Sequence, residues 1–372
     1  MSDRVAVSEP AAPVSTGVPN ARRVLVAGAK ILLALAIAGF IAYAVIGQWS
    51  QVRHAWLGLA WQSVLLSLVA AVAGMSANVM AWRASLRDLE YEVSFPVAAR
   101  INFIGALGKY LPGSVWVYVM QMEFGRRAGL PRARAFLASV VAVGLGTAAA
   151  LGIGTLALPS LLAGSRTGAG YSEPVRFAIY VLLALVPVAV VCSIPQVLTR
   201  LIQLMLRVLR RAPLTHRLTW PGVLRVVGWA TVAWLCFGAH LWLLANAQAA
   251  PGFRGLFLSF GAFPIAMTAG LFAIFAPSGL GVREAVLVAA LVPVLPASGA
   301  AGTALGIALA SRMVFIVADL ATAGVAALTG LRRATAVPAV PVPGTRPAGA
   351  APAVPPASAP GRQAGEPGEL RD

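Results

Sequence analysis

The sequence predicts an all-helical, polytopic membrane protein: a helix bundle of about eight spans with one or two re-entrant or broken segments. Hydrophobic residues make up 59% of the 372 residues and charged residues only 11%, and the mean hydropathy is +0.82, whereas an average soluble domain carries about 25% charged residues. Eight apolar stretches have roughly the 20 residues needed to cross a bilayer core of about 30 Å. Two sequences that break helices, GKYLPGSVW from Gly108 and FAPSGLGVRE from Phe275, interrupt the apolar pattern.

The predicted spans follow one another between two polar ends. They lie near residues 24–47, 55–82, 136–158, 177–195, 222–247, 256–276, 283–297 and 302–330. Residues 1–22 are polar and lack the apolar core of a signal peptide, so we expect a disordered cytoplasmic arm. Residues 332–372 are rich in Pro, Ala and Gly, and this composition predicts a disordered cytoplasmic tail. Residues 23–331 are then one transmembrane domain.

Basic residues set the expected orientation, because loops rich in Arg and Lys stay in the cytoplasm. Four clusters flank the spans: Arg22 and Arg23; Arg126, Arg127, Arg132 and Arg134; Arg200, Arg207, Arg210, Arg211 and Arg217; Arg332 and Arg333. Residues 164–172 and 247–255 are poorer in basic residues and are expected outside. We therefore expect a multi-pass protein of the plasma (inner) membrane with both termini in the cytoplasm.

The first break lies in an apolar segment, residues 96–121, that is expected to be re-entrant. The preceding span should end inside near Arg83 and Arg87, and the Arg126–Arg134 loop should also be inside. A full crossing between them would put that loop outside. The segment is therefore predicted to enter from the cytoplasm, turn at Pro112–Gly113 and return. An amphipathic surface helix or a different topology is the alternative.

The second break is predicted to end one helix and start another. Pro277 cannot continue a helix, and it pushes the residue before it towards an extended backbone. Gly279 and Gly281 allow positive φ angles, so a new helix is predicted from about Val282. Its free N–H groups and the positive end of its dipole would lie inside the protein. In transporters, paired broken segments of this kind mark the binding site.

In their order and spacing, the two breaks resemble those of the lysylphosphatidylglycerol synthase/flippase transmembrane-domain family, which includes the membrane half of the bacterial multiple peptide resistance factor. The resemblance covers residues 24–330. It is carried by YLPGSVW from Tyr110, with Asn102 and Gly105 upstream, and by PSGLGVRE from Pro277. It implies a lipid-translocating domain with re-entrant segments. Full-length resistance factors continue into a soluble aminoacyltransferase domain, and the Pro-rich tail takes that place here, so we expect no synthase activity.

The expected function is to bind or flip an anionic lipid or a lipid-linked intermediate, such as a polyprenyl phosphate. The candidate headgroup-binding residues gather at the two breaks and on the last predicted span: Lys109, Tyr110, Pro112, Gly113, Trp116, Pro277, Gly279, Gly281, Arg283, Glu284, Arg312 and Asp319. In this hypothesis Lys109, Arg283 and Arg312 hold the phosphate, together with helix N-termini.

Several candidates also have a purely structural interpretation. Lys109 could extend to the cytoplasmic interface, and Trp116 and Tyr118 could belong to an interfacial aromatic belt. Arg283 lies in the first turn of a helix, where the dipole disfavours a cation. It is therefore expected to have a partner, either an acid or an anionic ligand.

Arg312 and Asp319 are seven residues apart and share one face of the last predicted span. Each needs its own partner at membrane depth. Arg312 could pair with Glu284, and Asp319 with His240 or a backbone donor. A structural ion pair that holds the bundle is the alternative for both, and His240 is more simply a satisfied core residue.

Other function classes find little support. The chain has no His-Glu-x-x-His run, P-loop or catalytic triad, and no metal or cofactor is expected. The net charge of +17 comes mostly from arginines in loops and tails, so nucleic acid is not an expected partner. Cys192 and Cys236 are expected core residues, whereas Gly144, Gly146, Gly152 and Gly154 are expected at close helix contacts. A membrane enzyme that uses Asp88, Glu90 and Glu92, and a scaffold for other proteins, stay open as alternatives, as does a homo-oligomer.

Overall fold

The computed structural model describes residue 32 and residues 60–111, 115–158, 173–208, 210, 217–272, 279, 281–296 and 299–332. The arm 1–22, the predicted span 24–47 apart from Leu32, and the tail 332–372 apart from Arg332 lie outside this part of the chain. The described elements confirm the all-helical class: α3 (Trp61–Asp88), α4 (Phe95–Ala106), η1 (Leu107–Tyr110), α5 (Trp116–Arg127), α6 (Arg132–Gly154), η2 (Thr155–Ala157), α8 (Glu173–Ser193), α9 (Pro195–Val208), α10 (Trp220–Ala249), α11 (Gly252–Phe272), α12 (Val282–Leu291), η4 (Val292–Val294) and α13 (Ala300–Arg332).

Among the described residues, five helices are long and apolar enough to cross a membrane: α3, α6 with its η2 extension, α10, α11 and α13. The pair α8 and α9 is a sixth candidate, bent by 86° at the break between them. The protein is therefore a polytopic helical membrane protein. The predicted span 283–297 is wrong as a crossing, because α12 has only 10 residues, which is about 15 Å of helix.

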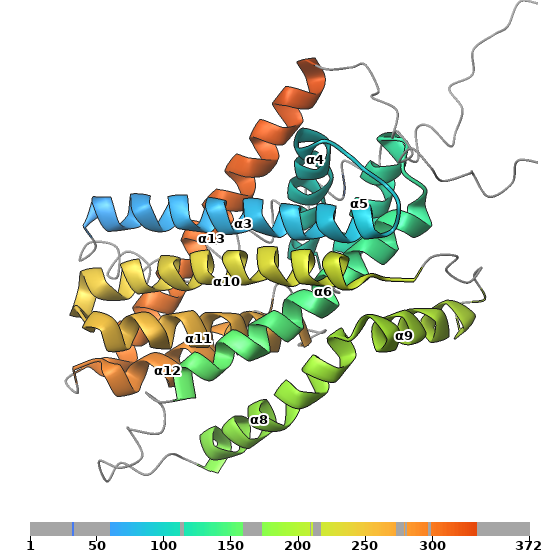
Figure 1. Ribbon diagram of the computed structural model, residues 1–372. Helices are drawn as coiled ribbons and strands as arrows, with labels where there is room; N and C mark the ends of the chain where they lie inside the picture. The colour runs from blue at the N-terminus through green and yellow to red at the C-terminus, as the bar shows by residue number, and fades with distance from the viewer. Residues whose placement is uncertain are drawn as a thin grey trace, which may run out of the picture.

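The antiparallel helices α3 and α10 lie side by side along most of their lengths (Figure 1). Their ends are joined by Asp88, whose carboxylate accepts hydrogen bonds from the Thr219 N–H (3.0 Å) and hydroxyl (2.6 Å). The Thr219 side chain in turn accepts from the Gly222 N–H and caps α10. An acid beside a helix N-terminus is electrostatically favourable. Asp88, considered above for a membrane enzyme, thus joins two helices.

A polar contact lies inside this apolar bundle. His240 on α10 is fully buried, and its two ring nitrogens lie 2.7 Å from the Ser67 Oγ and 2.9 Å from the Ser311 Oγ. These contacts join α3, α10 and α13. They confirm that His240 is a satisfied core residue.

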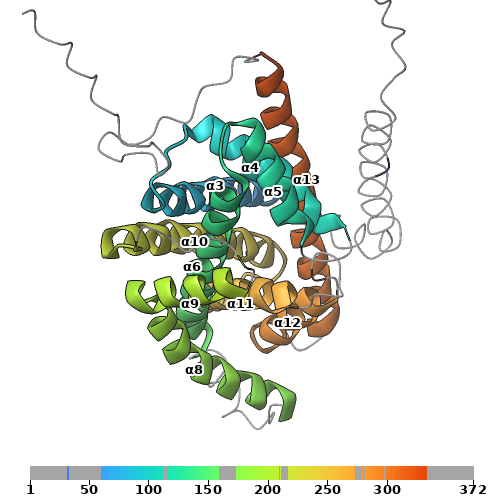
Figure 2. The ribbon, with the colours of Figure 1, turned by 90° about the vertical axis from the view of Figure 1, so that its right-hand side faces the viewer.

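α4, η1 and α5 form a helical hairpin instead of a span. α4 and α5 have 12 residues each, about 18 Å of helix per arm, and they pack against each other beside α3, α6 and α13 (Figure 2). The return is tight at Gly108, where an added Cβ would lie 2.8 Å from the backbone of Trp116 and Val117. The arms are too short to cross, in agreement with the predicted re-entrant segment, whose turn at Pro112–Gly113 is outside the described residues.

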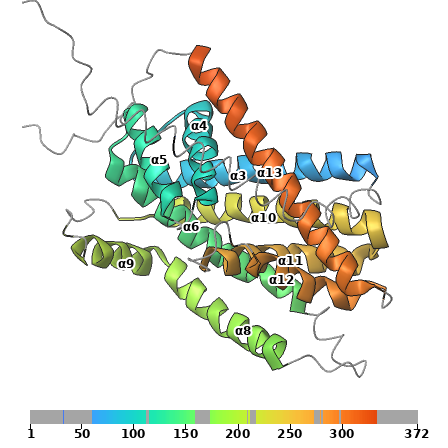
Figure 3. The same ribbon diagram turned by 180° about the vertical axis from the view of Figure 1, so that it is seen from behind.

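The described residues of the second break also have the predicted form. α11 ends at Phe272, Gly279 and Gly281 have φ angles of +66° and +86°, and α12 begins at Val282 as expected. An added Cβ on Gly279 would lie 2.7 Å from the Cα of Gly270 on α11. Gly279 therefore lies directly against α11, and α13 runs obliquely from α12, across α3 and α10, to α4 (Figure 3).

The amphipathic helix α9 is an element that the sequence analysis missed. Its first residue, Pro195, ends the run of α8 by removing a helical hydrogen-bond donor. Thr199, Ile202 and Leu206 are buried, whereas Arg200 and Arg207 are exposed. The arginine-rich region treated above as a loop therefore begins with a helix that packs one face on the bundle.

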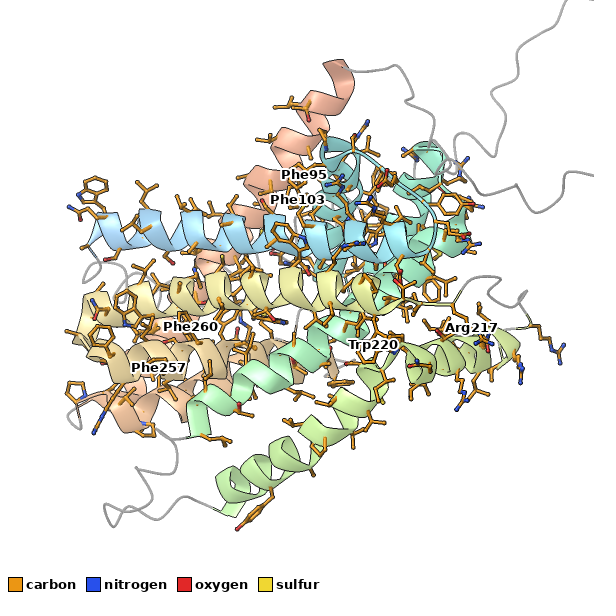
Figure 4. All side chains as sticks on the ribbon, in the orientation of Figure 1. Phe95, Phe103, Arg217, Trp220, Phe257 and Phe260 are labelled. Carbon is orange, nitrogen blue, oxygen red and sulfur yellow. The ribbon has the colours of Figure 1, made fainter. Side chains whose placement is uncertain are left out.

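The two ends of the bundle differ in charge, which makes the expected orientation testable. Figure 4 shows Arg217 and Trp220, at the start of α10, at one end, and Phe257 and Phe260 on α11 at the other. The end with Arg217 is expected to face the cytoplasm.

We expect single cysteines at Ala133 and Phe253 to label from opposite membrane sides in a chain whose Cys192 and Cys236 are replaced by alanine. Both test positions are exposed, and Ala133 follows the basic loop before α6. Labelling with a membrane-impermeant maleimide in right-side-out cells and in inverted vesicles measures this. Modification of the Ala133 cysteine from outside would show that the re-entrant topology is wrong.

Candidate functional site

A cavity of about 340 Å³ lies inside the bundle, between the hairpin and the second break. Helices α3, α6, α10, α11 and α13 complete its wall. Most of its surface is apolar. Among the described residues, the charged side chains that line it are Lys109, Arg283 and Asp319, which come from the first break, the second break and the last span. The structure thus brings together three candidates that are far apart in sequence.

Arg283 occupies an unusual place for an arginine. It is 5% exposed, and its guanidinium carbon lies 4.9 Å from the ring centroids of both Phe263 and Phe315. One Nη donates to the Ser311 hydroxyl at 2.9 Å. The Nε is buried without a hydrogen-bond partner among the described residues, and none of the ion pairs formed among them includes Arg283. The acid expected as one possible partner is thus not found in this part of the chain.

Glu284 and Arg312 form the predicted ion pair. The carboxylate accepts from an Nη of Arg312 at 2.5 Å and from the Gly281 N–H at 2.7 Å, so it joins α13 to the first turn of α12. Both side chains are buried, and neither lines the cavity. Arg312 is therefore engaged by Glu284 and does not border the cavity.

Asp319 pairs with the first break instead of His240, so that expected contact is wrong. Its carboxylate lies 2.5 Å from the Lys109 Nζ and accepts from the Tyr110 hydroxyl at 2.6 Å. Asp319 is 3% exposed and the Lys109 side chain 29%. These contacts join the tip of the hairpin to α13. Lys109 thus faces the cavity as half of an ion pair.

A buried chain of hydrogen bonds along the cavity wall was not found from the sequence. Trp82 donates to the Ser139 hydroxyl at 3.0 Å, Ser139 donates to the Gln121 carbonyl oxygen at 2.7 Å, and the Gln121 amide donates to Asn102 at 3.1 Å. All four side chains line the cavity. A Cβ on Gly105 would lie 2.7 Å from the Gln121 Cγ. The motif residues Asn102 and Gly105 thus position Gln121. A polar glutamine in an otherwise apolar segment was the sequence feature that could have indicated this chain.

The other candidates divide between the cavity and its surroundings. Gly279 lines the cavity, as does Tyr118, whereas Trp116 is exposed and lies outside it. Tyr110 is buried against α13, and Gly281 precedes α12. Pro112, Gly113 and Pro277 lie outside the described residues.

The expected close packing at the glycines of α6 is wrong for three of them. A Cβ built on Gly144, Gly146 or Gly152 would meet no atom within 4 Å. Gly154 does lie at a close helix contact, because a Cβ built on Gly261 would lie 2.9 Å from the Gly154 carbonyl oxygen. Gly146 lines the cavity, and its carbonyl accepts from the Trp234 Nε1 at 2.8 Å.

Comparison with known proteins agrees with this architecture. A search of curated proteins found no match. A sequence model of the family described as "Lysylphosphatidylglycerol synthase TM region" matches residues 29–318, which include the hairpin, the second break and two of the three charged residues that line the cavity, Lys109 and Arg283. The match covers most of the chain. The protein belongs to the lysylphosphatidylglycerol synthase transmembrane-region family.

Proposed function

We propose that the protein binds an anionic lipid by its phosphate, in the cavity between the two broken segments, and moves that lipid across the membrane. The observation that carries this proposal is Arg283, which borders the cavity with a buried Nε that has no partner among the described residues. A buried cation with no acid in direct contact is costly, and a phosphate oxygen would supply both a contacting negative charge and the missing acceptor.

The charges around the cavity favour an anion. Lys109 and Asp319 neutralise each other at 2.5 Å, whereas Arg283 has no carboxylate partner in the described part of the chain. One positive charge is therefore left for a ligand. The Phe263 and Phe315 rings hold the guanidinium in place by cation–π contact, which is worth about 2 kcal/mol when desolvated.

The rest of the lining favours a ligand with an apolar part. Most of the residues around the cavity are apolar, which suits the glycerol and acyl portions of a lipid better than a free sugar or nucleotide. Phospholipids and polyprenyl phosphates share the combination of a phosphate and an apolar chain. The proposal is therefore made for that chemistry, with phosphatidylglycerol as the first probe.

The test is a headgroup-accessibility assay in vesicles that contain the purified protein. With phosphatidylglycerol labelled by nitrobenzoxadiazole on one acyl chain, dithionite bleaches only the outer leaflet of protein-free vesicles. We expect vesicles with the protein to lose nearly all fluorescence, because labelled lipid from the inner leaflet reaches the outer one.

The other function classes give different results in the same experiment. A membrane enzyme would leave the inner leaflet protected and produce a new lipid species by mass spectrometry. A scaffold would change neither. Protection of the inner leaflet in vesicles that hold correctly folded protein would overturn the transport part of the proposal.

A further inference from the structure

A strip of aromatic rings runs along the cavity wall from α6 to Arg283. Trp234, Phe237 and Phe315 all line the cavity. The ring centroids of Trp234 and Phe237 are 5.7 Å apart, those of Phe237 and Phe315 are 5.2 Å apart, and Phe315 contacts the guanidinium of Arg283. At its other end the strip is fixed by the hydrogen bond from Trp234 to the Gly146 carbonyl. The strip is thus a continuous apolar surface between Gly146 and the buried cation.

Gly146 stands at the end of this strip without a packing reason for being glycine. A Cβ there would meet no atom within 4 Å, and glycine is less favourable than alanine in a helix interior. Its φ angle is not among the positive ones, so the backbone does not require glycine either. A side chain at position 146 would occupy space next to the cavity.

The cavity reaches the outer surface of the bundle beside Gly146. Val143 on α6 and Leu271 on α11 both line the cavity, and each is 36% exposed. α6 and α11 are packed neighbours. Both side chains are apolar, so this exposed part of the cavity lining suits contact with the acyl region of a bilayer rather than with water.

We infer that the acyl chains of the bound lipid run along the Trp234–Phe237–Phe315 strip and leave the bundle past Gly146, through the opening at Val143 and Leu271. The inference rests on the proposed function, because the phosphate held by Arg283 fixes where the chains begin. It adds a second subsite, for the apolar part of the lipid, and makes position 146 the residue that controls its width. A lipid would then stay partly in the bilayer while its headgroup is inside the protein.

The experiment compares Gly146→Leu with Gly152→Leu. Both glycines lie on α6 with no atom within 4 Å of an added Cβ, but only Gly146 lines the cavity. Two ligands are titrated into each purified protein in detergent: dioctanoyl phosphatidylglycerol, and glycerophosphoglycerol, which has the same headgroup without acyl chains. Melting temperatures show that both variants are folded.

We expect Gly146→Leu to weaken binding of the dioctanoyl lipid about tenfold, the effect of roughly two methylene groups losing their buried contacts, and to leave binding of glycerophosphoglycerol unchanged. Gly152→Leu should change neither. Bleaching of the inner leaflet in vesicles should slow in Gly146→Leu alone. Val143→Trp, which narrows the opening from an exposed position, is a second variant with the same expected pattern in case Gly146→Leu does not fold.

The possible failures are distinguishable. Equal lipid affinities in the 146, 152 and 143 variants and in the parent protein would overturn the acyl path and leave the proposed function standing. If Gly146→Leu weakens the binding of both ligands, the substitution acts at the headgroup, and the acyl path is overturned as well. Absence of lipid binding in the parent protein would remove the proposed function and this inference together.

Discussion

Glu284→Ala is expected to lower the free energy of unfolding by about 3–5 kcal/mol, the usual effect of leaving a buried charge without its partner. The substitution removes the carboxylate that Arg312 contacts at 2.5 Å and also the acceptor of the Gly281 N–H. Arg312 would then be an uncompensated cation inside the bundle. Chemical denaturation of the protein in detergent micelles, followed by tryptophan fluorescence, measures the change.

Two further variants show whether burial is the cause. Glu92→Ala removes the surface ion pair between Glu92 (53% exposed) and Arg87 (61% exposed). This substitution should lower the free energy of unfolding by about 1 kcal/mol or less. The double variant Glu284→Leu with Arg312→Leu removes both buried charges and should recover much of the lost stability. A Glu284→Ala protein as stable as the Glu92→Ala protein would contradict the structure of this pair.

Arg283→Ala is expected to weaken binding of dioctanoyl phosphatidylglycerol by about 10- to 100-fold, since a hydrogen bond to a charged group contributes about 1.5–3 kcal/mol. Arg283→Lys should recover only part of the affinity, because an ammonium is a point charge without the fork of a guanidinium. Isothermal titration with the detergent-solubilised protein measures both. Arg254→Ala removes an exposed arginine from α11 and serves as the matched control.

The stability of the Arg283 variant separates a binding role from a structural one. Arg283 has no acidic partner in the described part of the chain, so its removal strands no buried carboxylate. The melting temperature should therefore fall less than in Glu284→Ala. Lost stability with unchanged affinity per folded molecule would show that Arg283 holds the bundle together instead of binding lipid.

Much of the fold follows from hydropathy, and its errors have clear physical causes. Apolar length located α3, α6, α10, α11 and α13, because a span must bury about 20 residues in lipid whatever its neighbours are. The same criterion wrongly predicted that α12 crosses the membrane, because a short helix buried among other helices is as apolar as a membrane span. Apolar length also missed α9. Its arginines are as frequent as in a polar loop, and only the helical arrangement shows that they share one exposed face.

The site could be predicted as a set of residues, but of its contacts only the Glu284–Arg312 pair was predicted. Charges at membrane depth are costly enough that Lys109, Arg283 and Asp319 stand out in the sequence. Which of them pair depends on how the tip of the hairpin packs against α13. Asp319 lies 210 positions after its partner Lys109 in the sequence, so the pairing could not be read from spacing. The aromatic partners of Arg283 could not be found either, because Phe263 and Phe315 have the spacing and burial of ordinary core residues.

The contact between Gly279 and Gly270 has a genetic consequence. Alanine at 279 would bring its Cβ to 2.7 Å from the Gly270 Cα, in a backbone with a φ angle of +66°. Position 270 already carries the smallest residue, so no second substitution there can relieve the clash. The strain can be removed only by moving the two backbones apart, and a shift at Gly279 would displace the start of α12 and Arg283 with it. Suppressors of such an allele are therefore expected in the surroundings of α12 and not at its point of contact.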